Sequence, residues 1–340
     1  MTPLAPPSPA ELQAAAARLG LLRDTLNNVL FGQQQLIEHV ITGILASGHI
    51  LLEGLPGLGK TELVKGLAAA CGLEAKRIQF TPDLLPGDIT GNPILQEIDG
   101  ARRFVFQPGP IFANLVLADE INRASPKTQS ALLEAMQERR VTVMGETREL
   151  PRPFFVLATQ NPIELEGTYP LPEAQLDRFL FKLEVLRNDV PVLEKIIRLR
   201  EIGVSPDVRP CLTPGELLEL MVLARRIHLS EPVINYTARL CESTHPGNGP
   251  LSDNIRFGAS PRAALALAAA AKARALLHQR PNASIEDIQA LALPVLRHRL
   301  ILTYDARLAG KTSVDIITEL IATLPTETAK LPKTLADAKL

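Results

Sequence analysis

Eight consecutive residues have the types and spacing needed to hold phosphate. They match the pattern G-x-x-x-x-G-K-[S/T] at every specified position, after the apolar run 50–53 and before the helix-compatible run 62–70. Glycines let backbone N–H groups turn inward around phosphate oxygens, and the N-terminus of the following helix directs positive potential at the same charge. The predicted nucleotide-binding loop comprises Gly54, Leu55, Pro56, Gly57, Leu58, Gly59, Lys60 and Thr61.

Four side chains in and beyond this loop have separate predicted tasks. Lys60 is expected to reach the β- and γ-phosphates of ATP, and Thr61 to offer its hydroxyl to Mg²⁺. The apolar run 115–118 ends in Asp119 and Glu120, and the carboxyl end of a buried parallel strand lies at the ligand crevice of an open α/β sheet. An acidic pair alone is typical of a solvated strand end. After a phosphate loop, it predicts that Asp119 holds Mg²⁺, largely through water, and that Glu120 is the general base.

Three further polar residues lie at the ends of predicted strands or helices. Asn161 comes just after the apolar run 154–158, where its amide is placed to contact the γ-phosphate or the attacking water. Arg178 ends a short helical pattern, and Arg262 follows Ser260 and Pro261, which are suited to the start of a helix. Either arginine alone is typical of a surface ion pair, but the set together with the loop indicates roles at a nucleotide.

The elements that must position these residues fall into two domains. Apolar strand candidates alternate with helical patterns from about residue 21 to 190, which predicts an α/β core with a parallel sheet. Thereafter helical patterns dominate, so we predict a helical domain over 213–340, joined by a Gly- and Pro-rich linker at 191–212. The proline-rich residues 1–20 are expected to be flexible. The strand candidates are 49–53, 76–80, 115–119, 154–158 and 181–185, and the helix candidates of the second domain are 215–228, 233–241, 261–279, 285–297 and 313–324.

Two segments of the core are predicted to form β-hairpins outside the main sheet. The first spans 94–106 and turns at Asp99-Gly100, a dipeptide that favours tight hairpin turns. The second spans 140–150 and alternates Val141 and Val143 before Gly145. By pattern alone, they are either edge decorations or functional insertions.

Composition narrows the class of protein. The 340 residues are 46% hydrophobic and 21% charged, and no apolar run approaches the roughly 20 residues of a membrane-spanning helix. The 36 basic and 37 acidic residues nearly cancel, which argues against sequence-independent nucleic-acid binding. Three scattered cysteines without C-x-x-C spacing indicate neither a metal site nor a disulfide framework. We therefore expect a cytoplasmic protein that neither enters a membrane nor binds nucleic acid.

Four longer motifs make the chain resemble the MoxR family of AAA+ ATPases, over residues from about 26 to 324. They read TPDLLPGDITG at 81–91, ADEINRA at 118–124, QSALLEAMQER at 129–139 and GTYPLPEAQLDRF at 167–179. The resemblance implies a five-stranded parallel sheet in the order 5-1-4-3-2 with helices on both faces, followed by an all-helical lid. It also implies assembly as a ring, usually of six chains, with ATP and Mg²⁺ as cofactors.

The resemblance also assigns roles to individual residues. It implies that Asn161 is sensor 1, that Arg178 is the finger inserted into a neighbour's site, and that Arg262 is the sensor 2 of the lid, which would close over ATP. Phe31 and Gly32 resemble the segment that borders adenine. The resemblance leaves Arg123 either at the subunit interface or in a structural ion pair. The two hairpins correspond to inserts that usually point toward a central pore.

The function implied is ATP-driven remodelling of a protein partner. MoxR-type proteins act in maturation, including metal-cofactor insertion, and typically work with proteins that carry a von Willebrand factor A domain. Three alternatives remain at this point: a magnesium chelatase-like motor subunit, a nucleic-acid motor, and a scaffold that binds ATP with little turnover. Near-neutral charge argues against the second, and the set Glu120, Asn161 and Arg178 argues against the third.

Overall fold

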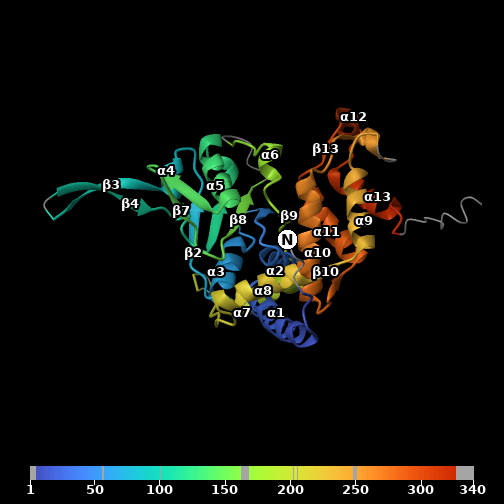
Figure 1. Cartoon of the computed structure of the whole chain (residues 1–340), viewed down its shortest axis with the longest axis horizontal. Helices are drawn as coiled ribbons and strands as arrows, with labels where there is room; N and C mark the ends of the chain where they lie inside the picture. The colour runs from blue at the N-terminus through green and yellow to red at the C-terminus, as the bar shows by residue number, and fades with distance from the viewer. Residues whose placement is uncertain are drawn as a thin grey trace, which may run out of the picture.

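A five-stranded parallel sheet forms the centre of the first domain in the computed structural model (Figure 1). The structure describes residues 5–55, 57–99, 101–161, 168–201, 203–204, 206–247 and 251–326. The strands lie in the order β2-β5-β8-β1-β9 and all neighbours are parallel. If these five strands are numbered 1 to 5 along the chain and the sheet is read from the β9 edge, the order is 5-1-4-3-2. The predicted strand order is therefore confirmed. The strands are β1 (Ile50–Glu53), β2 (Ala75–Gln79), β5 (Leu115–Asp119), β8 (Phe155–Gln160) and β9 (Phe181–Glu184).

Helices cover both faces of this sheet because its central strands are apolar on both sides. One apolar cluster on the α5 side of the sheet includes Leu132, Leu133 and Met136 of that helix. The other face packs on the first three helices of the chain. The core helices are α1 (Pro9–Val29), α2 (Gln34–Leu45), α3 (Lys60–Ala70), α4 (Pro86–Thr90), η1 (Ile121–Arg123), α5 (Pro126–Glu138) and α6 (Glu173–Leu176).

The second domain, here called the lid, is predominantly helical and lies beside the core (Figure 1). Two short strand pairs, which the sequence did not predict, join its helices. They are β10 (His228–Leu229) with β12 (Asn282–Ala283), and β11 (Ile255–Phe257) with β13 (Ile301–Leu302). The other elements of this domain are α8 (Pro214–Arg226), α9 (Glu231–Glu242), η2 (Ser252–Asn254), α10 (Pro261–Leu277), α11 (Ile285–Leu296), α12 (Tyr304–Leu308) and α13 (Ser313–Thr323).

The lid and the core share one continuous apolar interior. The cluster beneath the sheet runs from α1, α2 and α3 into α8, α9, α10, α11 and α13 without a break. In particular, α10 packs against both α1 and α2. Separating the two domains would expose this shared apolar surface to water, which is unfavourable in proportion to its area. The lid is therefore held to one side of its own core.

Two segments predicted to lack regular structure contain helices. Residues 1–20 were expected to be flexible, but α1 begins at Pro9 and buries Leu12 and Leu19. The prolines misled the prediction, because Pro9 occupies the first helical turn, where no N–H is required, and Ser8 and Glu11 form a capping box. Residues 1–4 lie outside the described part of the chain. The predicted linker 191–212 likewise begins with a helix, α7 (Val190–Leu199).

Both predicted hairpins are present. The longer one pairs β3 (Gly91–Ile98) with β4 (Ala101–Pro108) and extends away from the molecule on the side opposite the lid (Figure 1). Its turn includes Asp99 in a left-handed conformation, as expected, while Gly100 lies outside the described residues. The shorter one pairs β6 (Arg140–Val143) with β7 (Glu146–Glu149).

Candidate nucleotide-binding site

The phosphate loop joins β1 to α3, as the sequence predicted. Gly57 and Gly59 have φ angles of 82° and 83°, a left-handed conformation that favours glycine. Gly59 is also the N-cap residue of α3, and since it has no side chain, it cannot cap the first backbone N–H groups of the helix. These donors suit an anionic ligand. Pro56 lies outside the described residues.

Lys60 is held within the loop. Its Nζ donates a hydrogen bond to the carbonyl oxygen of Gly54 at 2.7 Å. Partial burial lowers the pKa of Lys60, although the neighbouring charges of Asp119 and Glu120 raise it. The ammonium group is thus fixed at the phosphate loop and shares a cavity with Asp119, the predicted metal ligand, and Glu120, the predicted general base.

Asp119 ends β5 beside the loop, and both of its carboxylate oxygens are engaged. Oδ1 accepts from the hydroxyl of Thr159 at 2.6 Å. Oδ2 accepts from Nε and Nη2 of Arg77 at 3.1 and 2.7 Å. Arg77 lies on β2, next to β5 in the sheet. These contacts fix the orientation of the carboxylate that is predicted to hold Mg²⁺.

Glu120 has a left-handed backbone conformation, with φ of 57°, which turns its side chain out of the strand direction. Its N–H donates to the Thr159 hydroxyl at 2.8 Å, so one hydroxyl links both members of the acidic pair. Its Oε2 accepts from Nε2 of Gln79 at 2.8 Å and from Nη1 of Arg123 at 2.9 Å. Arg123 therefore forms an ion pair within the chain, one of the two roles considered for it.

Thr159, Arg77 and Gln79 were not predicted as site residues, although the sequence contains a signal for each. Thr159 lies near the end of β8, where polar side chains follow a buried strand. Arg77 and Gln79 alternate along β2, so their side chains point to the same face of the sheet. Only the pairing of β2 with β5 shows that this face meets Asp119 and Glu120.

One cavity of about 390 Å³ joins the predicted phosphate, metal and catalytic residues. Its size is within the usual range for a ligand site. Besides residues of the loop and the two strands described above, it is lined by Asn161, which follows β8 and is buried. Seven predicted site residues are brought together here: Gly57, Gly59, Lys60, Thr61, Asp119, Glu120 and Asn161.

Phe31 lines an adjacent cavity of about 380 Å³, which shares Gly57, Gly59 and Glu62 with the first. Two positively charged side chains, one from α7 and one from the residue that follows α7, lie over the Phe31 ring. The Nζ of Lys195 lies 4.3 Å from the ring centroid, and the Cζ of Arg200 lies 5.0 Å from it. An aromatic ring beside the phosphate loop fits the predicted adenine end of the site. The predicted neighbour Gly32 packs against Val192 of α7.

Arg178 and Arg262 line neither of these cavities. Both instead line another cavity of about 390 Å³, which lies between α5, α10 and the residues that follow α6. Nη1 of Arg178 donates to the carbonyl oxygen of Leu133 at 2.9 Å, and its buried Nε has no hydrogen-bond partner among the described residues. Arg262 thus lies apart from the phosphate cavity of its own chain, and its closure over ATP stays a prediction. The cavity containing these two arginines is called the arginine cavity below.

A buried arginine of the lid holds the segment that carries Arg178. The Nε of Arg299 donates to Oδ1 of Asp177 at 2.7 Å. Its Nη2 donates to the carbonyl oxygens of Asp177 and Phe179 at 3.2 and 2.7 Å, and its Nη1 donates to that of Leu180 at 3.2 Å. These bonds hold the residues that precede and follow Arg178 in the chain. The lid therefore fixes the position of the predicted finger.

Lid residues near Arg262 contact the same segment. The hydroxyl of Ser260 donates to Oδ2 of Asp177 at 2.9 Å, and Nη1 of Arg262 lies 3.8 Å from that oxygen. Ser260 is the N-cap residue of α10, as predicted, but its hydroxyl serves this contact rather than the cap. The two predicted arginines thus form part of one cluster.

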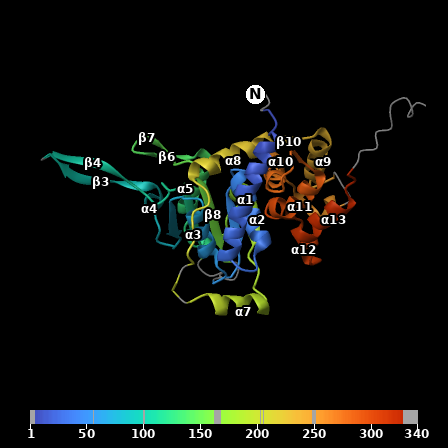
Figure 2. The same cartoon turned by 90° about the horizontal axis from the view of Figure 1, so that it is seen from below.

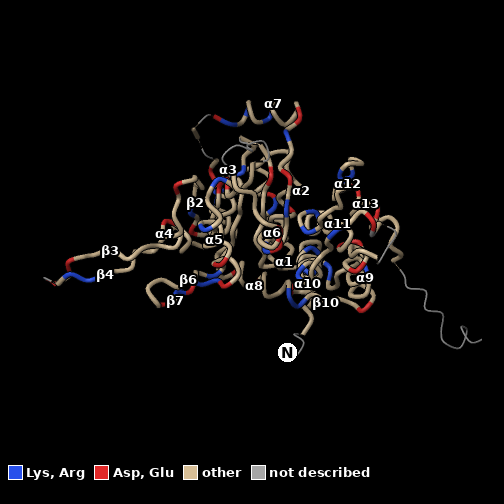
Figure 3. The backbone as a smooth tube through the Cα atoms, turned by 90° about the horizontal axis from the view of Figure 1, so that it is seen from above, with Lys and Arg blue, Asp and Glu red and all other residues tan. Residues whose placement is uncertain are grey.

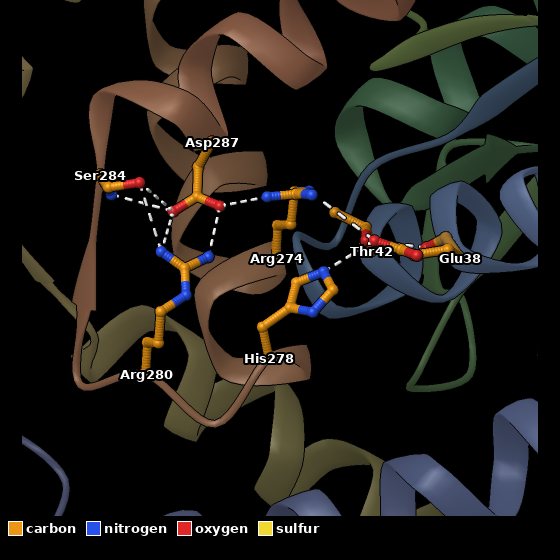
Figure 4. Close-up of polar contacts among 7 residues, drawn as sticks. All are labelled: Glu38, Thr42, Arg274, His278, Arg280, Ser284 and Asp287. Atoms are coloured by element: carbon orange, nitrogen blue, oxygen red, sulfur yellow. Dashed lines mark hydrogen bonds and ion pairs between the residues drawn. The ribbon is translucent and has the colours of Figure 1, made fainter.

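A second polar network joins the lid to the core through α2 (Figure 4). Nε2 of His278 lies 2.8 Å from Oε1 of Glu38, and Nε of Arg274 lies 3.7 Å from the same oxygen. Arg274 also contacts Asp287, a fully buried carboxylate that Arg280 contacts as well. The lid is therefore attached to the core by polar contacts as well as by apolar packing.

Replacing Arg299 with alanine should strongly destabilise the fold. The change leaves the carboxylate of Asp177 and three carbonyl oxygens without this donor, and breaking a buried ion pair costs about 3–5 kcal/mol. Urea denaturation should show a correspondingly lower free energy of unfolding. Arg18→Ala, which removes an exposed ion pair with Glu219, serves as the control and should cost about 0–1 kcal/mol. Equal effects of the two changes would contradict the assigned role of Arg299.

The fold and this site define a P-loop ATPase of the AAA+ class with a helical lid. The model of the family described as "ATPase family associated with various cellular activities (AAA)" matches residues 49–181, and that of the AAA lid domain matches residues 251–320. Similarity to curated relatives is specific enough to show the family within this class. The chain belongs to the MoxR family of AAA+ ATPases.

Three comparisons illustrate this relationship. The chain is 44% identical over 318 residues to Chaperone MoxR1 of Mycobacterium tuberculosis, covering 92% of this chain and 83% of that one. It is 30% identical to Protein MoxR of Paracoccus denitrificans, covering 89% and 95%. A crystal structure of a candidate ATPase from Cytophaga hutchinsonii superposes with a TM-score of 0.86 at 39% identity, covering 92% of this chain and 96% of that one.

The described residues contain neither a membrane-spanning helix nor a cluster of metal-ligating side chains. Among these residues, no helix has both the length and the apolar character required to cross a membrane. The described residues also contain no group of three or more His, Cys, Asp or Glu side chains arranged to hold a metal ion. Thr61 and Asp119, which line one cavity, remain the predicted pair for Mg²⁺, an ion that keeps several waters and needs few protein ligands.

Proposed function

We propose that the chain hydrolyses ATP in the cavity that lies beside the phosphate loop and is lined from β2, β5 and the residue after β8. The observation that carries this proposal is the convergence of Lys60, Thr61, Asp119, Glu120 and Asn161 on that cavity. Lys60 binds the phosphates, Asn161 positions the γ-phosphate or the water, and Glu120 accepts the proton of the attacking water. Bound Mg²⁺, held by Thr61 and Asp119, supplies charge neutralisation for the phosphates.

The proposed ATPase acts as a ring in which each chain completes its neighbour's site. Support comes from the position of Arg178 and Arg262, which line a separate cavity from the phosphate loop of the same chain. Each arginine can then reach phosphate only on another copy. Such an interface joins two different surfaces, and it closes into a ring when the rotation between copies closes. We propose six copies, on the basis of the family resemblance.

The client of the proposed ring is a protein, and a von Willebrand factor A domain protein is the leading candidate. A relative named as a chaperone supports the general role. The β3–β4 hairpin supports client contact, because it extends far from the core and exposes Leu95 and Phe104, which pair midway along its strands. Lys and Arg are interspersed with Asp and Glu along the backbone of both domains (Figure 3), and the 36 basic and 37 acidic residues nearly cancel, so the net charge does not favour nucleic acid. Maturation of the client, including metal-cofactor insertion, is the proposed outcome.

A variant that binds ATP without hydrolysing it should retain its client. Glu120→Gln, purified with ATP from the source cell, should enrich one or a few proteins relative to Lys60→Ala, because slower release lengthens residence. Adding Phe104→Asp to Glu120→Gln should reduce this enrichment, since it places a charge on the exposed apolar hairpin.

The control for the hairpin change is Leu308→Asp in the same background, because Leu308 is exposed on α12 of the lid. It should leave enrichment unchanged. Enrichment of nucleic acid, with retention that falls steeply as salt rises, would instead support a nucleic-acid motor and contradict the proposed function.

A further inference from the structure

Helix α7 makes few contacts with the rest of the chain, among them Lys195 over the ring of Phe31. All ten of its residues are described, and none is buried. Its inner side reaches the core through Val192, which packs against Gly32, and through Ile196, which lines the cavity of Phe31. Figure 2 shows α7 at one end of the molecule, standing apart from the sheet.

The outer side of α7 carries an apolar stripe. Val190, Leu193 and Ile197 are spaced i, i+3 and i+7, which places them on one face of a helix. They are 69%, 46% and 78% exposed. These three residues are called the α7 stripe below. An isolated exposed apolar residue needs no explanation, but a row of them on one helix marks an interaction surface.

The α7 stripe lies at the same end of the molecule as the phosphate loop. Figures 2 and 3 place α7 at one end near α3, which begins at the loop, and place α8 and the β6–β7 hairpin at the opposite end. The inner side of α7 also lines the cavity that shares Gly57 and Gly59 with the phosphate cavity. Whatever approaches the nucleotide from outside therefore comes close to this helix.

The arginine cavity lies at the opposite end. Its lining includes Ser47 and Arg139, and Arg139 directly precedes β6. Nη2 of Arg225, near the end of α8, donates to the hydroxyl of Ser47 at 3.1 Å. A copy that presents Arg178 to the phosphate loop of its neighbour must therefore turn this end toward the neighbour's α7.

We propose that the α7 stripe is a docking surface for a second copy of this chain, which it contacts at the end that carries the arginine cavity. That end offers apolar partners: Leu265, one turn after Arg262 on α10, is 71% exposed, and Val222, one turn before Arg225 on α8, is 50% exposed. A second copy fits better than a client, because the nucleotide site at the α7 end is incomplete without one. This inference rests on the proposed ring.

Charging the stripe should prevent assembly without harming nucleotide binding. Wild-type protein with Mg-ATP should sediment as an assembled species, whereas Ile197→Asp should shift toward monomer, with association weakened about 30-fold or more, as for the loss of an interface hot spot. Binding of a fluorescent ATP analogue by the monomer should persist. Leu308→Asp, a change at another exposed apolar residue, on α12, should assemble normally.

The outcomes separate this inference from the ring proposal. Assembly of Ile197→Asp at wild-type concentrations would overturn the role of the stripe and leave the ring standing. Normal assembly combined with loss of client capture would assign the stripe to the client instead, and would equally overturn the inference. A wild-type chain that remains monomeric with Mg-ATP at every concentration would overturn both proposals.

Cross-linking tests which surfaces meet. In a mixture of Ile197→Cys and Leu265→Cys chains, a short bismaleimide should produce a cross-linked dimer, because a head-to-tail interface brings the two positions together on different copies. Each variant alone should give only the background of the wild type, in which Cys71 and Cys241 are buried and Cys211 is partly exposed. Cross-linking of Ile197→Cys to itself would indicate a two-fold interface and contradict the proposal.

Discussion

Replacing Glu120 with glutamine should leave ATP binding intact and lower turnover by about 10²–10⁴-fold, the usual contribution of general acid–base catalysis. The amide keeps the size and the hydrogen-bonding oxygen that Gln79 and Arg123 contact, so the site should not reorganise. It cannot accept the proton of the attacking water. Equilibrium binding of a fluorescent ATP analogue and steady-state phosphate release measure the two properties separately.

Two control variants separate loss of nucleotide binding from loss of hydrolysis. Lys60→Ala should lose nucleotide affinity as well as turnover, because it removes the ammonium held at the phosphate loop. Glu138→Gln, a matched change at an exposed residue that ends α5, should have wild-type kinetics. If Glu120→Gln hydrolysed ATP at the wild-type rate, the assignment of the general base would be wrong.

Removing the side chain of Arg178 should lower turnover by about 10³–10⁵-fold, the range for arginine fingers elsewhere. Arg178→Ala should nevertheless bind ATP normally, because its side chain lines a different cavity from the phosphate loop of its own chain. Arg262→Ala should show the same pattern, since Arg262 lines the same cavity as Arg178.

Mixing variants tests whether these arginines act on a neighbouring chain. Arg178→Ala and Lys60→Ala are each inactive alone, but a mixed ring can join an intact arginine end to an intact phosphate loop and recover part of the activity. Subunit exchange is verified with fluorescently labelled chains. Exchange without recovery would contradict action in trans, and Arg307→Ala, a change on the exposed helix α12, should behave as wild type throughout.

Much of the nucleotide site was predictable because its residues come in short contiguous motifs. The loop that ends in Lys60 and Thr61 lies between a strand and a helix, and its glycines fix its conformation locally. Asp119 and Glu120 end an apolar strand, so the parallel sheet brings them to the same edge as the loop. Their positions depend on local sequence and on strand order, which the family resemblance supplied.

Side-chain contacts between distant parts of the chain could not be predicted from the sequence. Thr159 links Asp119 to Glu120, and Arg77 reaches Asp119, only because β8 and β2 both pair with β5. Strand register is a property of the assembled sheet. A polar residue in an alternating strand pattern shows which face it shares with its neighbours, but not which side chain it meets.

The sequence by itself determined that this chain has a phosphate loop, an acidic pair and two arginines suited to a nucleotide. Only the tertiary structure decided that Arg178 and Arg262 lie in a cavity apart from that loop, and that α7 exposes an apolar stripe. The reason is physical. The lid takes its place through many weak apolar contacts between helices far apart in the sequence, together with the buried bonds of Arg299. Their sum depends on the whole packed interior and is encoded in no single motif.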